Sequence, residues 1–160
     1  MDRHVTRTVP LEVNGERHTV DVDADAPLAI VLRNRLGLTG VKVGCSLEQC
    51  GACAVLVDGE STMSCVRPAA EFAGRRIETV EGLGTPERPG LVQQALIDAR
   101  AAQCGYCTPG LVVAITALLR RDPVPRENTI RTALAPHLCR CGAHPRVLRA
   151  VRALASEVPG

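Results

Sequence analysis

Four cysteines in the first half of the chain have the spacing of iron ligands. Cys45, Cys50 and Cys53 follow the pattern C-x4-C-x2-C, and Cys65 comes further along. This is the plant-type spacing for a [2Fe–2S] cluster. A binuclear core needs four converging thiolates, so three of them must come from a loop that curls around it. Buried free cysteines are the alternative, but three cysteines in nine residues favour a cluster.

Two glycines flank these ligands and should let the loop curl. Gly44 precedes Cys45, and Gly51 follows Cys50. A glycine can take positive φ without a Cβ clash, and its backbone N–H can then point at a sulfur. Both glycines can therefore allow the curl that the loop needs.

A second set of four cysteines lies in the other half of the chain. Cys104 and Cys107 form a C-x-x-C pair, which by itself suits a redox dithiol or half of a zinc site. Cys139 and Cys141 form a C-x-C pair. Two ligands one residue apart cannot share a face of a regular helix, so this pair must sit on an irregular turn, as a compact cluster requires. On spacing alone, zinc remains the rival for this set.

The residues around Cys107 also suit an anionic metal centre. Thr108 and Pro109 have the character of a helix start. The positive end of the helix dipole would then lie near the sulfurs, stabilise negative charge there and raise the reduction potential.

Composition sets limits on the class of protein. Of the 160 residues eight are cysteines, in two groups of four separated by 38 residues without one, which indicates two metal centres. Four disulfides would suit a short secreted chain, but no apolar signal segment follows Met1, so we expect a cytoplasmic protein. A net charge of +2 gives no indication of nucleic-acid binding, and no apolar run is long enough to span a membrane.

The first half of the sequence alternates like a small sheet. Asn14-Gly15 and Asp58-Gly59 are hairpin-turn signals. Pro10 suits only an edge or bulged strand position. The expected elements are strands at 5–13, 17–22, 54–57, 61–65 and 76–80, with a helix at 28–36. One helix crossing four or five strands is typical of a β-grasp ferredoxin fold.

The second half has helical spacing. Apolar residues recur at helical intervals in four segments, near 91–99, 111–119, 130–134 and 147–154. A stretch rich in Gly and Pro precedes them. We therefore predict an α+β chain with a plant-type ferredoxin domain over 1–81, a linker over 82–90 and a four-helix bundle over 91–160 that binds the second [2Fe–2S] cluster.

The two motifs together resemble one family. Residues 104–110, Cys-Gly-Tyr-Cys-Thr-Pro-Gly, followed by Cys-Arg-Cys-Gly at 139–142 and preceded by the plant-type loop, closely resemble the small iron–sulfur subunit of the molybdenum hydroxylases. That family includes xanthine dehydrogenase, aldehyde oxidoreductase, carbon monoxide dehydrogenase and isoquinoline 1-oxidoreductase. The resemblance extends from about residue 9 to about residue 154.

The resemblance implies a partner and a direction for electron flow. The cluster of the second set would lie nearest a molybdopterin cofactor held by a separate large subunit, with the plant-type cluster farther out. Gln103 matches a glutamine that hydrogen-bonds the pterin, and Cys141 matches the ligand beside it. From the sequence alone, Gln103 could equally be a solvated helix-end residue.

Two features of this sequence can be compared with particular members of the family. Glu48 stands where many xanthine-dehydrogenase-type members have glycine, and it adds charge beside the outer cluster. Residues 142–147 look more like the isoquinoline and nicotinate dehydrogenase branch, which commonly passes electrons to a cytochrome without a flavin subunit, so FAD is not assured. Because eight thiolates fill two clusters, we expect His144 to have a helix-start or interface role and not to be a ligand.

These observations predict an oxidoreductase subunit that holds no catalytic residue of its own. It would relay electrons from the molybdenum centre of the large subunit through two [2Fe–2S] clusters to an FAD subunit or a cytochrome. The partner would hydroxylate a carbon of an N-heterocycle or an aldehyde. One alternative is a free-standing two-cluster ferredoxin-like carrier, although such a carrier needs only one cluster. Another is a zinc-bound binding module.

Overall fold

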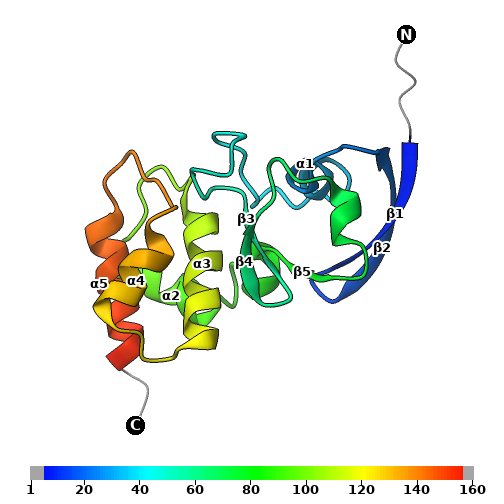
Figure 1. Ribbon diagram of the computed structural model, residues 1–160. Helices are drawn as coiled ribbons and strands as arrows, with labels where there is room; N and C mark the ends of the chain where they lie inside the picture. Colours follow the sequence, from blue (N-terminus) through cyan, green and yellow to red (C-terminus); the bar gives the residue numbers. More distant parts are fainter. Residues whose placement is uncertain (1–5, 157–160) are drawn as a thin grey trace.

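The computed structural model describes residues 6–156 and has the predicted α+β class. Within that range the chain forms a mixed five-stranded sheet, five α-helices and two short 3-10 helices. Figure 1 shows the sheet and the first helix in one half of the molecule and the other four helices in the other half. Residue 5, with which the first predicted strand begins, lies outside the described residues.

The sheet is built from two hairpins and one short strand. β1 (Thr6–Val13) pairs antiparallel with β2 (Glu16–Asp23), and β3 (Ala54–Val57) pairs antiparallel with β4 (Glu60–Met63). β5 (Arg76–Glu78) lies between the hairpins, parallel to β1 and antiparallel to β3, so the strand order is β2-β1-β5-β3-β4.

Pro10 lies in β1 where only one neighbour is paired. It faces Thr19 of β2, whereas pairing of β1 with β5 begins at Glu12. The missing N–H of proline therefore removes no bond to β5. This agrees with the expected edge position.

Asn14 does more than make the first turn. Its φ is +52° and that of Gly15 is +81°, as a tight hairpin turn requires. The Asn14 side-chain oxygen accepts a hydrogen bond from the Thr79 N–H at 2.8 Å, and its amide nitrogen donates to the Thr79 hydroxyl at 3.0 Å. Thr79 is fully buried. Asn14 thus joins the first hairpin to the end of β5.

Replacing Asn14 with alanine should destabilise the fold. The buried Thr79 N–H would lose its partner, at a cost of about 1–3 kcal/mol in the free energy of unfolding. Urea unfolding followed by circular dichroism measures this cost. Asn14→Asp keeps the acceptor and tolerates positive φ, so it should lose less; equal losses for the two variants would contradict the role given to the acceptor.

One helix covers the sheet on the side away from the other helices. α1 (Leu28–Asn34) buries Leu28 and Leu32 completely, in a core cluster that also contains Phe72 and Leu11. The structure ends this helix at Asn34, two residues before the predicted end.

The four predicted helical segments all form helices. They are α2 (Leu91–Asp98), α3 (Thr108–Arg121), α4 (Glu127–Leu134) and α5 (His144–Ser156). Their facing sides form a second core cluster that includes Leu111, Ile115 and Val147. Pro109 and Pro145 each occupy the second position of a helix, where a missing N–H costs nothing. No helix within residues 6–156 is long and apolar enough to cross a membrane.

The two halves of the molecule pack against each other along β3 and α3. All four residues of β3 are buried, because one face of the strand belongs to the first core cluster and the other packs on α3. Ala54 and Leu56 of β3 contact Val113 of α3. Arg120 of α3 donates two hydrogen bonds, of 2.7 and 3.1 Å, to the carboxylate of Glu78 in β5.

The stretch between the halves is held at several points. It starts in a short 3-10 helix, Val80–Leu83. The Glu81 carboxylate accepts a hydrogen bond from the Gly40 N–H at 2.7 Å. The Gln93 side chain accepts one from the Gly90 N–H at 2.7 Å and donates one to the Val80 carbonyl at 3.1 Å. This stretch is therefore a fixed connection and not a free tether.

Candidate metal centres

The first cysteine loop has neither helix nor strand over residues 44–53 and curls through left-handed backbone. Ser46, Glu48 and Gly51 have φ of +52°, +57° and +76°. The left-handed value at Glu48 explains why glycine suits that position: a side chain there is strained. Gly44, in contrast to Gly51, is not left-handed. Its role is close approach, because a Cβ at Gly44 would lie 2.9 Å from the Cys50 sulfur.

Backbone N–H groups point at the sulfurs, as expected. The Leu47 and Gln49 N–H groups donate to the Cys45 sulfur at 3.3 and 3.4 Å. The hydrogen bond from Gln49, followed by that from Leu47, lowers the pKa of Cys45 to about 7 against the opposing effect of burial. The Ser64 N–H donates to the Cys53 sulfur at 3.4 Å. These contacts stabilise the thiolate forms that bind iron.

The first four thiols form two pairs. Cys45 lies within hydrogen-bonding reach of Cys50, and Cys53 within reach of Cys65. The first pair is partly exposed, whereas Cys53 and Cys65 are only 1% and 6% exposed. Burial raises the pKa of Cys53 to about 11. A bound cation would be needed to keep this buried thiol ionised at neutral pH.

The second four thiols repeat this arrangement. Cys104 and Cys141 are within hydrogen-bonding reach on the outside of the molecule, and Cys107 and Cys139 are paired against the helical core. Burial raises the pKa of Cys107 to about 12. The Ala143 N–H donates to the Cys139 sulfur at 3.4 Å.

The backbone around this second set has the expected form. Cys139 and Cys141 lie on a turn between α4 and α5. Cys107 precedes the first residue of α3, so its sulfur is close to the start of that helix. The predicted irregular turn and helix start are both confirmed.

The pairs fit a binuclear cluster better than a single ion. None of the eight cysteines, all within the described residues, is in a disulfide. Among residues 6–156, no three Cys, His, Asp or Glu side chains gather around one point that could hold one metal ion. In a [2Fe–2S] cluster two cysteines bind each iron and sulfides bridge the irons, which matches two thiol pairs per site.

The two cysteine sets are in direct contact through the backbone. The Leu138 N–H donates to the Cys50 carbonyl at 3.0 Å, and Leu138 precedes Cys139. Gly110, in the first turn of α3, packs on the Gly51 peptide; a Cβ there would lie 3.1 Å from the Gly51 carbonyl carbon. The Tyr106 hydroxyl donates to the Val43 carbonyl at 2.7 Å. One hydrogen bond thus connects a residue of the first set to the neighbour of a residue in the second.

His137 is a residue at this contact that the sequence did not indicate. It is 3% exposed, and its ring fills the space beside Gly51. Burial, reinforced by the electrostatic effect of the neighbouring His144 ring, lowers the pKa of His137 to about 4, so the His137 ring is neutral at pH 7. His144 begins α5, and its Nε2 is 2.7 Å from the His137 carbonyl oxygen. A lone histidine in an irregular stretch carries no periodic signal, so sequence analysis could not place it.

Gln103 lies in the exposed connection between α2 and α3. Its neighbour Cys104 is also exposed, and Cys141 is partly so. The structure thus places Gln103 next to the outward-facing thiol pair of the second set.

Comparison with known proteins gives two family matches that together cover most of the chain. Residues 11–79 match the 2Fe-2S iron-sulfur cluster binding domain, and residues 79–152 match the [2Fe-2S] binding domain. The chain is therefore an iron–sulfur protein with two [2Fe–2S] clusters.

Individual relatives and solved structures define the family of this iron–sulfur protein more closely. The chain is 52% identical to one of the subunits of nicotinate dehydrogenase from Pseudomonas putida, over 91% of this chain and 92% of the relative. A chain of quinoline 2-oxidoreductase from Pseudomonas putida 86 superposes with a TM-score of 0.89 at 33% identity, covering 94% of each chain. Aldehyde oxidoreductase from Desulfovibrio gigas superposes with a TM-score of 0.87 at 39% identity over 95% of this chain, which corresponds to 17% of that longer chain.

The chain belongs to the family of small iron–sulfur subunits of the molybdenum hydroxylases. Its function is electron transfer, and its partner is a large molybdopterin-binding subunit. The identity with a component of nicotinate dehydrogenase agrees with the branch that residues 142–147 indicated.

Proposed function

We propose that the eight cysteines are the ligands of the two clusters, one set of four for each. Cys45 with Cys50, and Cys53 with Cys65, would each hold one iron of the plant-type cluster. The other cluster would use Cys104 with Cys141 and Cys107 with Cys139. The four thiol pairs support this assignment. We further propose a β-grasp domain over 1–81, a connection over 82–90 and a four-helix bundle over 91–160.

The observation that best supports electron transfer between the two clusters is the direct contact between the two cysteine sites. When bound, each cluster supplies a one-electron redox centre. The chain keeps the two sites at a fixed, short separation, since the Leu138 N–H is bonded to the Cys50 carbonyl and α3 packs on the Gly51 peptide. The backbone N–H groups that point at Cys45, Cys53 and Cys139 stabilise the negative charge that reduction adds.

The exposed thiol pair of the second set, Cys104 and Cys141, indicates the side on which electrons would enter the chain. Cys104 is exposed, so the iron held by Cys104 and Cys141 would face a neighbouring subunit. We propose that the molybdopterin of the large subunit lies against this face, with Cys141 beside it and Gln103 hydrogen-bonded to the pterin. The plant-type cluster would then pass electrons outward to a cytochrome or a flavin subunit.

Relatives suggest the chemistry of the whole complex. Two of them are named for nicotinate and quinoline, both N-heterocycles. We propose that the partner hydroxylates a ring carbon of an N-heterocycle, and, because free cysteines need a reducing compartment, that the complex is cytoplasmic. Reduction of the clusters in the purified complex by nicotinate-type compounds, compared with aldehydes, tests the substrate class. Cell fractionation tests the location.

Replacing Gln103 with alanine tests the proposed contact with the pterin. Both clusters should assemble, because the side chain is exposed in this chain. Loss of the hydrogen bond should weaken the contact by about 0.5–1.5 kcal/mol and slow reduction of the clusters by substrate in the complex. Reduction by dithionite bypasses the molybdenum centre and should be unchanged. If substrate reduces variant and wild type equally fast, Gln103 is only a solvated residue and the role must be withdrawn.

A further inference from the structure

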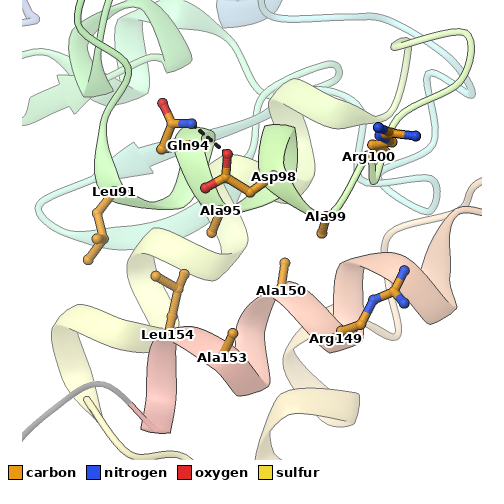
Figure 2. Close-up of a pocket in the computed structure, with 10 residues that line it drawn as sticks. All are labelled: Leu91, Gln94, Ala95, Asp98, Ala99, Arg100, Arg149, Ala150, Ala153 and Leu154. Carbon is orange, nitrogen blue, oxygen red and sulfur yellow. Dashed lines mark hydrogen bonds between the residues drawn. The ribbon is translucent and has the colours of Figure 1, made fainter.

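A groove runs between α2 and α5, and its two ends differ in character. Its floor is formed by small side chains, among them Ala95 and Ala150. Figure 2 shows Leu91 and Leu154 at one end, and Arg100 and Arg149 on opposite sides of the groove at the other end. The groove thus has an apolar end and a basic end.

The basic end adjoins the exposed cysteine pair of the second set. Arg100 follows α2 and leads into the connection that carries Cys104, while Arg146 and Arg149 lie in the first half of α5, shortly after Cys141. The Arg146 guanidinium donates to the Arg100 carbonyl at 3.4 Å. All three arginines are exposed.

These three arginines lie together on the chain's second half and have no acidic partner among the described residues. Within residues 6–156 none of them forms an ion pair, and Asp98, the acidic residue that lines the groove, instead accepts a hydrogen bond from Gln94 at 2.8 Å. Some other arginines are paired with carboxylates, as Arg120 is with Glu78, whereas Arg121 and Arg126 are exposed and likewise form no ion pair within the same range of residues. The arginines that do form ion pairs are Arg67, Arg75, Arg120, Arg131 and Arg152.

An unpaired group of guanidinium ions is a good surface for carboxylates. Arginine binds a carboxylate with two parallel hydrogen bonds and is enriched at protein interfaces. Like charges held together repel, and a partner of opposite charge relieves that repulsion. Arg100 also lies three residues before Gln103 and four before Cys104 in the chain, so the basic end is close to the face where the large subunit would approach for electrons to enter.

We infer that Arg100, Arg146 and Arg149 dock a carboxylate-bearing segment of the large molybdopterin-binding subunit beside the second cluster. This inference rests on the proposed direction of the relay and adds the chemistry of the contact. The arginines orient the two subunits so that the exposed cysteine pair meets the molybdenum site. The apolar end of the groove then receives the uncharged part of the same segment.

The test is a charge reversal at Arg146 and Arg149 in the cluster-loaded protein. Glutamate near the start of α5 suits the helix dipole, so the fold should be retained. The control is Arg121→Glu with Arg126→Glu, which makes the same charge change on exposed residues at the other end of the helices. Binding to the purified large subunit is measured at about 0.05 M and about 0.5 M NaCl, because salt screens exposed charges.

At low salt the Arg146/Arg149 variant should bind at least about tenfold more weakly than wild type, whereas the control pair should bind like wild type. High salt should narrow this difference. Equal affinities for the variant and the control would overturn the inference. Unchanged affinity together with a shifted midpoint potential of the second cluster would also overturn it and would show that the arginines only offset the charge of the cluster. Failure of wild type itself to bind the large subunit would instead contradict the proposed function.

Discussion

Cys50→Ser should abolish the plant-type cluster while the other cluster survives. The variant should contain about half the iron of wild type, because the two sets of thiols are separate and a missing thiolate leaves one iron under-coordinated. Electron paramagnetic resonance should show one remaining signal. The first core should also unfold at lower temperature, since the loop over residues 44–53 has neither helix nor strand to hold it.

Cys104→Ser is the reciprocal control for this prediction. It should remove the cluster of the second set, spare the plant-type signal and again leave about half the iron. Loss of both signals in either variant would contradict independent assembly at the two sites, and with it the division of the chain into two cluster-binding domains.

Gly51→Ala should strongly destabilise the contact between the two cysteine loops while leaving all eight thiols in place. Gly51 has φ of +76°, a conformation that costs an alanine about 1–2 kcal/mol. The added Cβ would also meet the His137 ring and lie 2.9 Å from the His137 Cα, and overpacking of this kind costs about 1–3 kcal/mol more. Thermal unfolding and the iron content of the first site measure the combined effect.

Gly74 supplies the matched control for Gly51→Ala. Its φ is +77°, but a Cβ there would have no atom within 4 Å. Gly74→Ala should therefore lose only the free energy that an alanine with positive φ costs, and it should retain both clusters. If the two alanine variants unfold at the same temperature, the contact between Gly51 and His137 does not hold the two loops together.

The elements that could be predicted from the sequence are those with a local signal. Helical periodicity located α2 to α5 within a few residues, and Asn14-Gly15 and Asp58-Gly59 marked both hairpin turns. These patterns depend on near neighbours in the chain, so one sequence is enough to detect them.

The arrangement of the site could be predicted only in part. The spacing of the cysteines separated them into two sets of four, but it gave no indication of how the thiols pair within a set. Gly44 could be recognised as a residue that lets the loop curl, but the sequence did not show that its lack of a side chain is needed for the approach of the Cys50 sulfur. The positions of His137 and Gly110 against Gly51 depend on how the two halves pack. Contacts of this kind join residues far apart in sequence, and no periodic pattern reports them.

The packing of Gly110 on the Gly51 peptide has a kinetic consequence. In many electron-transfer proteins a domain must move before an electron can be transferred. Such a motion is slower in solutions of glycerol or sucrose, because these solutions are viscous. Here the two loops already touch, and the Glu78–Arg120 ion pair joins the halves at the other end of α3. The rate of electron transfer between the two clusters should therefore not depend on solvent viscosity. Only the rate of encounter with the external acceptor should decrease as viscosity increases.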